Sequence, residues 1–175
     1  MSKQTMTPDR VGKEYSAGIS FNSGIDLYYC VERNENFFIG KQWEGVQSNG
    51  LPTPVFNFLK RVVLFSVANI STDNLKLWAR AMSSSGGRNT QTLELVADIL
   101  NDQFASIFEH NSIGGRIREF TRNAAVDGDG CMYTYWDDTA ETGQASKGAI
   151  RTEVLMNTQV LFGNPNNRDV QSQPY

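Results

Sequence analysis

The sequence predicts an α+β fold, in which a long helix and a shorter helix pack on a small, mostly antiparallel sheet. Three observations lead to this prediction. Apolar residues recur at helical spacing over residues 92–126, and a shorter stripe of the same kind covers residues 55–68. After Gly130, aromatic and polar residues alternate in the way that is typical of strands.

The composition limits the classes of protein to consider. The chain has 175 residues, of which 39% are apolar and 20% charged, so neither a disordered nor a membrane protein is favoured. The net charge of −3 argues against a protein that binds nucleic acid through a basic face. The same charge is compatible with a protein that DNA passes without binding to it. The longest apolar run, Val62–Phe65, is too short to cross a bilayer.

The first third of the chain predicts an arm, a compact aromatic segment and a helix. Residues 1–24 are polar, lack the apolar core of a signal peptide and are expected to form a flexible N-terminal arm, with residues 25–175 as one region. Ile25–Tyr29 fits either a helix or an extended segment, whereas Phe37–Trp43 indicates a buried loop or short strand. Thr53 and Pro54 are expected to cap a helix over Val55–Ala68.

The middle of the chain contains the strongest helical signal. Leu75–Met82 predicts a strand or a short helix with Trp78 packed inward, and Ser83–Gly87 predicts a flexible loop. One long helix is expected from about Thr92 to Val126, with a bend at Gly114–Gly115 because each glycine costs about 1 kcal/mol relative to alanine.

The C-terminal part predicts a hairpin followed by irregular chain. Asp127–Gly130 should end the long helix, because glycine readily takes the left-handed conformation found there. We expect a strand over Cys131–Trp136, a polar loop over Asp137–Lys147 and a returning strand over Ala149–Val154. An extended segment over Thr158–Phe162 and a turn over Gly163–Arg168 should follow. We expect Phe162–Tyr175 to connect to further polypeptide.

The motifs predict no catalytic, cofactor-binding or metal-binding residues. His110 is the one histidine, and a nucleophilic enzyme would have to use it. Asp127–Asp129 opens like a calcium loop, but Cys131 and Met132 occupy the positions that need an oxygen ligand and glycine. The acidic residues Asp137, Asp138 and Glu141 fit a solvated loop better than a metal site, and no phosphate-binding glycine motif is present.

Cysteine and arginine residues likewise have ordinary explanations. Cys30 and Cys131 lie in apolar, aromatic stretches and are expected to be small buried hydrophobes in a reducing compartment; a disulfide between them stays open as an alternative that no sequence feature supports. Arg116, Arg118 and Arg122 fit a solvated helix face better than a phosphate clamp.

Four stretches together resemble the portal proteins of tailed bacteriophages. They are Phe37–Gly45 with its Gly-Lys-Gln-Trp, the helix at Val55–Ala68, the long helix running through Arg122–Gly130 into Tyr133–Asp137, and Leu161–Pro165 with Asp169–Tyr175. The resemblance covers most of residues 37–175 and places the chain in the N-terminal wing portion of a portal subunit, with stem, clip and crown regions expected beyond residue 175. It implies a structural protein and not an enzyme.

The resemblance also implies partners and a location. Portal subunits form a ring, usually a dodecamer, at one vertex of the capsid in the virion, and double-stranded DNA passes through it non-specifically during packaging and ejection. Such a ring contacts the major capsid protein, the terminase large subunit and the head–tail connector, and uses neither a cofactor nor a membrane. Two alternatives stay open: another head or tail connector protein, and a small enzyme that uses His110.

Overall fold

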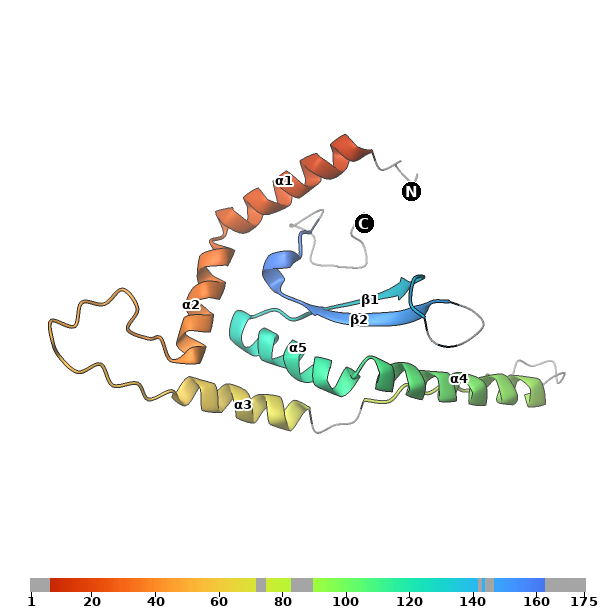
Figure 1. Cartoon of the computed structure of the whole chain (residues 1–175). Coiled ribbons are helices and arrows are strands. Elements are labelled where there is room, and N and C mark those ends of the chain that lie inside the picture. The colour runs from red at the N-terminus through yellow and green to blue at the C-terminus, as the bar shows by residue number, and fades with distance from the viewer. Residues whose placement is uncertain (1–6, 72–74, 83–89, 142, 144–146, 163–175) are drawn as a thin grey trace. The chain divides into compact units, whose positions relative to one another are not determined.

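The protein has an α+β fold, as predicted (Figure 1). The computed structural model describes residues 7–71, 75–82, 90–141, 143 and 147–162. Over these residues the elements in chain order are α1 (Pro8–Gly24), α2 (Leu27–Ile39), α3 (Phe58–Ile70), α4 (Thr90–His110), α5 (Ile113–Asp127), β1 (Cys131–Asp137), β2 (Ala149–Leu155) and the short 3-10 helix η1 (Asn157–Gln159).

The chain divides into two compact units. The first unit comprises residues 1–63, 123–131 and 155–175, and the second comprises residues 64–122 and 132–154. Each unit is therefore built from segments that are distant in the sequence. Helices α3 and α5 and both strands contribute residues to each unit.

Residues 8–24, within the stretch expected to form a flexible arm, are helical. Thr7 has an extended backbone and Pro8 is the first helical residue, a position where the missing N–H of proline costs nothing. Gly18 of α1 lies so close to Leu161 that a Cβ atom there would be 2.9 Å from the Leu161 Cβ. The Asn22 side chain also donates a hydrogen bond to the Val160 carbonyl (3.4 Å). Helix α1 therefore contacts a segment that is distant in the sequence.

Helix α2 extends through residues that were expected to form a loop or strand. Phe37, Phe38 and Ile39 form its last turn, so that prediction is wrong for these three residues. Gly40 ends the helix with a φ of 93°, and the Lys41 N–H then bonds to the Asn36 carbonyl (2.8 Å). The aromatic cluster therefore belongs to a helix end.

Helix α3 confirms the second predicted helix but begins three residues later. Asn57, and not Thr53, supplies the cap: its Oδ1 accepts the Lys60 N–H (2.9 Å). The Asn57 amide also donates to the Phe38 carbonyl (2.7 Å), which ties the start of α3 to the end of α2. This long-range bond explains the shift, because local sequence favours a cap at either position.

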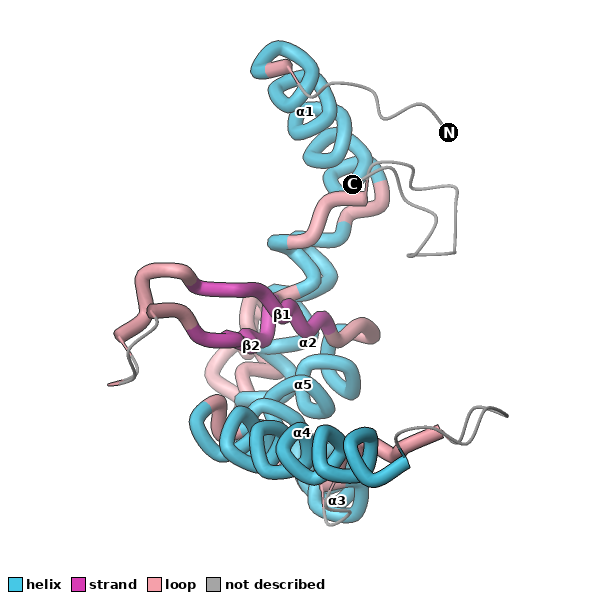
Figure 2. The backbone as a smooth tube through the Cα atoms, turned by 90° about the vertical axis from the view of Figure 1, so that its right-hand side faces the viewer, coloured by secondary structure: helices cyan, strands magenta, loops and turns pink. Residues whose placement is uncertain are grey.

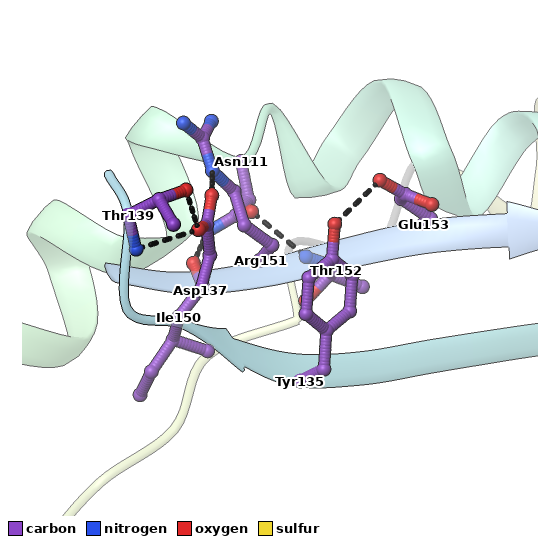
Figure 3. A network of polar contacts seen from close by, with 8 residues as sticks. All are labelled: Asn111, Tyr135, Asp137, Thr139, Ile150, Arg151, Thr152 and Glu153. Atoms are coloured by element: carbon purple, nitrogen blue, oxygen red, sulfur yellow. Dashed lines mark hydrogen bonds and ion pairs between the residues drawn. The ribbon is translucent and has the colours of Figure 1, made fainter. Parts of the chain in front are cut away.

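The predicted long helix is two helices. The break lies at Asn111 and Ser112, just before the glycine pair where a bend was expected, and Ser112 has a φ of 49°. Gly114 and Gly115 are part of the first turn of α5. The buried side chain of Asn111 binds strand β2, and this contact accounts for a break at that residue (Figure 3).

Strands β1 and β2 form the predicted antiparallel hairpin (Figure 2). Its register is marked by Thr134 and Thr152, whose hydroxyl oxygens are 3.2 Å apart. Gly128 has a φ of 92° and follows the end of α5, as predicted. At Gly148 the φ is 117° and a Cβ atom would collide with the Trp136 ring, so only glycine fits at the start of the returning strand.

The predictions for residues 75–82 and for residues 158–162 are wrong. Leu75–Met82 forms neither helix nor strand, and Trp78 is 77% exposed instead of packed inward. Residues 158–162, expected to be extended, begin within the 3-10 helix η1. The expected loop over Ser83–Gly87 and the expected turn over Gly163–Arg168 lie outside the described residues, as does the rest of the chain to Tyr175.

Candidate functional site

An apolar groove lies in the second unit. Its volume is about 680 Å³. Helices α4 and α5 form one wall, the hairpin strands form another, and the segment after α3 borders it. Its lining is aromatic and aliphatic, including Phe104, Phe108, Ile117, Phe120, Met132 and Ile150.

The few polar side chains of this apolar groove have hydrogen-bond partners. The hydroxyl of Thr121 donates to the Ile117 carbonyl (2.7 Å), and Thr134 and Thr152 share a hydrogen bond across the hairpin. These groups offer little to a polar substrate because their bonding capacity is partly used within the protein. The groove is therefore suited to apolar side chains and lacks the convergent ionisable groups that chemistry requires.

A polar network holds the hairpin to the helices (Figure 3). The amide of Asn111 donates to the Ile150 carbonyl (2.8 Å), and its Oδ1 accepts the Thr152 N–H (2.9 Å). One side chain thus makes the two backbone hydrogen bonds to β2 that a neighbouring strand would make. Asn101 does the same for the segment after α3, bonding both the N–H (2.7 Å) and the carbonyl (3.2 Å) of Ala79.

Sequence reasoning missed both asparagines, Asn101 and Asn111. The available signal was their position: each is an amide residue on or beside the apolar stripe of a helix, where burial without partners would be costly. An amide at such a place indicates that a backbone segment lies close enough to bond with it.

Ionisable groups on the hairpin have shifted pKa values for local reasons. The Thr139 hydroxyl (2.7 Å) and N–H (3.0 Å) donate to Asp137, and together with Arg151 they lower the pKa of that carboxyl. Tyr135 donates to Glu153 (2.8 Å), which raises the pKa of the phenol. These bonds stabilise one conformation of the hairpin.

His110 lies in a separate polar pocket of about 400 Å³ in the second unit. Its side chain is exposed at the end of α4, and its Nδ1 is 3.1 Å from the Ser106 carbonyl oxygen. Glu141 and Arg151 also line this pocket. Among the described residues, the ring bonds to this backbone carbonyl and to no carboxylate or nucleophilic side chain of the kind found in catalytic triads.

Two of the three acidic residues considered for metal binding, Asp137 and Glu141, have other partners. Asp137 is bound by Thr139 and lies 3.6 Å from the Arg151 guanidinium, and Glu141 pairs with Lys147 (2.9 Å). In the part of the chain that the structure describes, no three histidine, cysteine or acidic residues gather closely enough to hold a metal ion.

The structure corrects the expectation for one cysteine and refines that for the arginines. Cys30 is exposed on α2, so it is not a buried hydrophobe, and Cys131 is half-buried; both are free thiols. Burial, and secondarily the charge of Asp129, raise the pKa of Cys131. Arg116 is half-buried and donates to the Asn111 carbonyl (2.8 Å), where it supports the break between α4 and α5, whereas Arg118 is exposed.

Large apolar side chains are exposed on several elements. Helix α3 is the extreme case: Phe58 and Phe65 are 67% and 70% exposed, and Leu59, Val62 and Leu64 are exposed as well. Among the described residues, the buried apolar ones are Val67, Ala97, Ile113 and Ala140. A helix that is apolar over most of its surface normally lies inside a protein or an interface, so α3 has the character of a contact surface.

No helix in the described ranges is long and apolar enough to cross a membrane. No protein-family model matches the chain, and no curated protein and no solved structure shows significant similarity to it.

Proposed function

We propose that the chain is the N-terminal wing portion of a bacteriophage portal subunit, a structural protein that assembles into a ring. The observation that carries the proposal is the exposed apolar surface of α3 together with the scarcity of buried apolar side chains in the described residues. Burial of apolar surface is the main driving force of folding and of association, and a lone subunit leaves much of it unused here. Contact with neighbouring subunits would use it.

The candidate site favours an assembly role over catalysis. The apolar groove offers a surface for side chains of another protein, and the polar network ties backbone segments together without presenting reactive groups. Among assembly proteins, we favour the portal class because Phe37–Gly45 and the segment from α5 into β1 resemble portal sequences. The net charge of −3 is compatible with a channel along which DNA slides without being held.

In this proposal the subunit belongs to the virion, at one vertex of the capsid. Its partners are other copies of itself, usually twelve in a ring, the major capsid protein, the terminase large subunit and the head–tail connector. Double-stranded DNA passes through the ring without sequence-specific contacts during packaging and ejection. The proposed role requires no cofactor and no catalysed reaction.

Electron-microscope class averages of the assembled full-length gene product test the proposal. We expect a closed ring of about twelve subunits around a hole wide enough for duplex DNA, which is roughly 20 Å across by its groove dimensions. A monomer or a two-fold dimer at every concentration would contradict it. In that case the polar pocket around His110 becomes the next surface to investigate.

A further inference from the structure

The outward face of α3 combines aromatic side chains with an exposed positive charge. Phe58, Val62 and Phe65 follow one another at i, i+4 and i+7, so they lie on one face of the helix. Arg61 lies beside them and is exposed, whereas Val67 marks the buried side. Arg61 has no ion-pair partner among the described residues. We call Phe58, Arg61, Val62 and Phe65 the α3 face.

The outward face of α4 has the complementary character. Leu95 and Ile99 are 62% and 53% exposed, while Ala97, on the opposite side of the helix, is buried. A row of exposed carboxylates runs alongside these two residues at i, i+4 and i+8, formed by Glu94, Asp98 and Asp102. None of the three pairs with a cation from the described residues. We call Leu95, Ile99 and this acidic row the α4 face.

The charges on the two helices determine whether the α3 face pairs with a second α3 face or with an α4 face. The sequence of α3 carries Lys60 and Arg61 and no acidic residue, whereas α4 carries four acidic residues and neither lysine nor arginine. Two α3 faces placed together would oppose like positive charges, and two α4 faces would oppose like negative charges. Contact of an α3 face with an α4 face brings opposite charges together around an apolar centre, the usual arrangement of a specific interface.

The two rings of the α3 face offer a substantial part of the area that a stable contact needs. Phe58 and Phe65 are 67% and 70% exposed and offer roughly 280 Å² in total. A standard interface buries about 800 Å² on each partner, so these two rings would supply about a third of it. Val62 and the stem of Arg61 would add to the same surface.

We infer that the α3 face of one copy of the chain docks on the α4 face of the next copy. The contact joins two different surfaces, so every subunit offers one of each and the contact can repeat from subunit to subunit until a ring closes. The inference rests on the proposed function in that both require copies of the chain to associate. It adds the surfaces that meet and the residues that select them.

Charge-reversal variants of the full chain test the inference by sedimentation velocity and native mass spectrometry. Arg61→Glu on its own, and Asp98→Arg on its own, should each weaken association on the order of tenfold, because each places like charges across the contact. Lys13→Glu changes the net charge by the same amount as Arg61→Glu on an exposed position of α1 and should leave association unchanged. Far-UV circular dichroism checks that each variant keeps its helices.

Rescue provides the decisive measurement. Arg61→Glu with Asp98→Arg in one chain should restore association, and so should an equimolar mixture of the two single variants, which should form alternating assemblies. Replacing the rings, with Phe58→Ser and Phe65→Ser, should weaken association about 30-fold or more, as loss of central aromatic residues does in other interfaces.

The outcomes separate this inference from the proposed function. If the wild type forms rings and the charge variants assemble equally well, the inferred surface is wrong and the portal proposal stands. If the charge variants break an open or two-fold assembly of the wild type and the combined variant restores it, the surface is right and the portal proposal is wrong. A wild-type chain that is monomeric at all concentrations overturns both.

Discussion

At the scale of single residues, asparagine side chains connect segments that carry no regular hydrogen bonds to one another. Asn101 binds the backbone of Ala79, and Asn111 binds the backbone of β2 at Ile150 and Thr152. An amide side chain can do this because it presents a donor and an acceptor in the same arrangement as a peptide group. The second unit is held together partly by this device.

The first prediction concerns Asn111. Asn111→Ala should lower the free energy of unfolding by about 1–3 kcal/mol, because it leaves the buried N–H of Thr152 without its partner and also removes the part-buried hydrogen bond to the Ile150 carbonyl. Asn34→Ala, at an exposed position of α2, serves as the control and should change stability by less than about 0.5 kcal/mol. Urea unfolding followed by circular dichroism measures both, and equal effects would argue against this role for Asn111.

At the scale of elements, the break between α4 and α5 has a local and a long-range cause. Ser112 takes a left-handed conformation, and its carbonyl accepts the N–H groups of Gly115 (2.9 Å) and Arg116 (3.2 Å) at the start of α5. Asn111 is meanwhile bound to β2. The two glycines in the first turn of α5 make that turn a poor continuation of α4.

The second prediction tests this break. Ser112→Gly should raise the free energy of unfolding by about 0.5–1 kcal/mol, because glycine adopts a positive φ without the steric cost that serine bears. In a continuous helix the same change would destabilise by a similar amount. Thermal unfolding gives the sign, with Ser106→Gly at an exposed position inside α4 as the matched control that should destabilise. A loss of stability for Ser112→Gly would mean that the helices are continuous in solution.

The third prediction concerns the pH dependence of the hairpin. Hydrogen bonds from Thr139, aided by Arg151, lower the pKa of Asp137 below its ordinary value of 3.8. A lowered pKa in the folded state means that this stabilisation is fully present above about pH 4 and is lost as the pH falls through the lower folded value. Thr139→Ala should therefore raise the pKa of Asp137 toward 3.8, as measured by NMR titration of its side-chain carboxyl resonance. Thr158→Ala is the control, and an unchanged Asp137 titration in Thr139→Ala would refute the assignment.

At the scale of the whole molecule, the described residues place much of their aromatic and aliphatic surface in contact with water. Exposed phenylalanines of α3 and exposed aliphatic residues of α4 belong to this surface, as do Trp78 and Met82. A subunit of this kind gains stability when a neighbour covers these side chains. Folding and assembly are therefore expected to be linked.

The fourth prediction follows from that linkage. The midpoint temperature of unfolding should rise with the concentration of the chain, because association stabilises only the folded state. The variant with Phe58→Ser and Phe65→Ser should show a weaker dependence on concentration, since it lacks two exposed rings of α3. Differential scanning calorimetry at several concentrations tests this, with Tyr15→Ser on α1 as a control for the loss of an exposed aromatic residue. A midpoint independent of concentration in the wild type would show that the chain does not associate.

The sequence by itself determined the fold class and most of the elements. Apolar spacing predicted α3 and a helical stretch from about Thr92 to Val126, and alternation predicted the strand over Cys131–Trp136, because these patterns reflect the period of each element. The glycine after α5 was predicted for a similar local reason. These are features that neighbouring residues determine.

Only the tertiary structure decided where elements begin, break and meet. Asn57 caps α3 and bonds to the end of α2, Asn111 breaks the long helix by binding β2, and α1 is ordered against residues 160–161. Each of these boundaries and contacts depends on a residue outside the helix concerned. The exposure of α3 belongs here as well, because an apolar stripe predicts that a helix face is covered but does not specify whether its own chain or another one covers it.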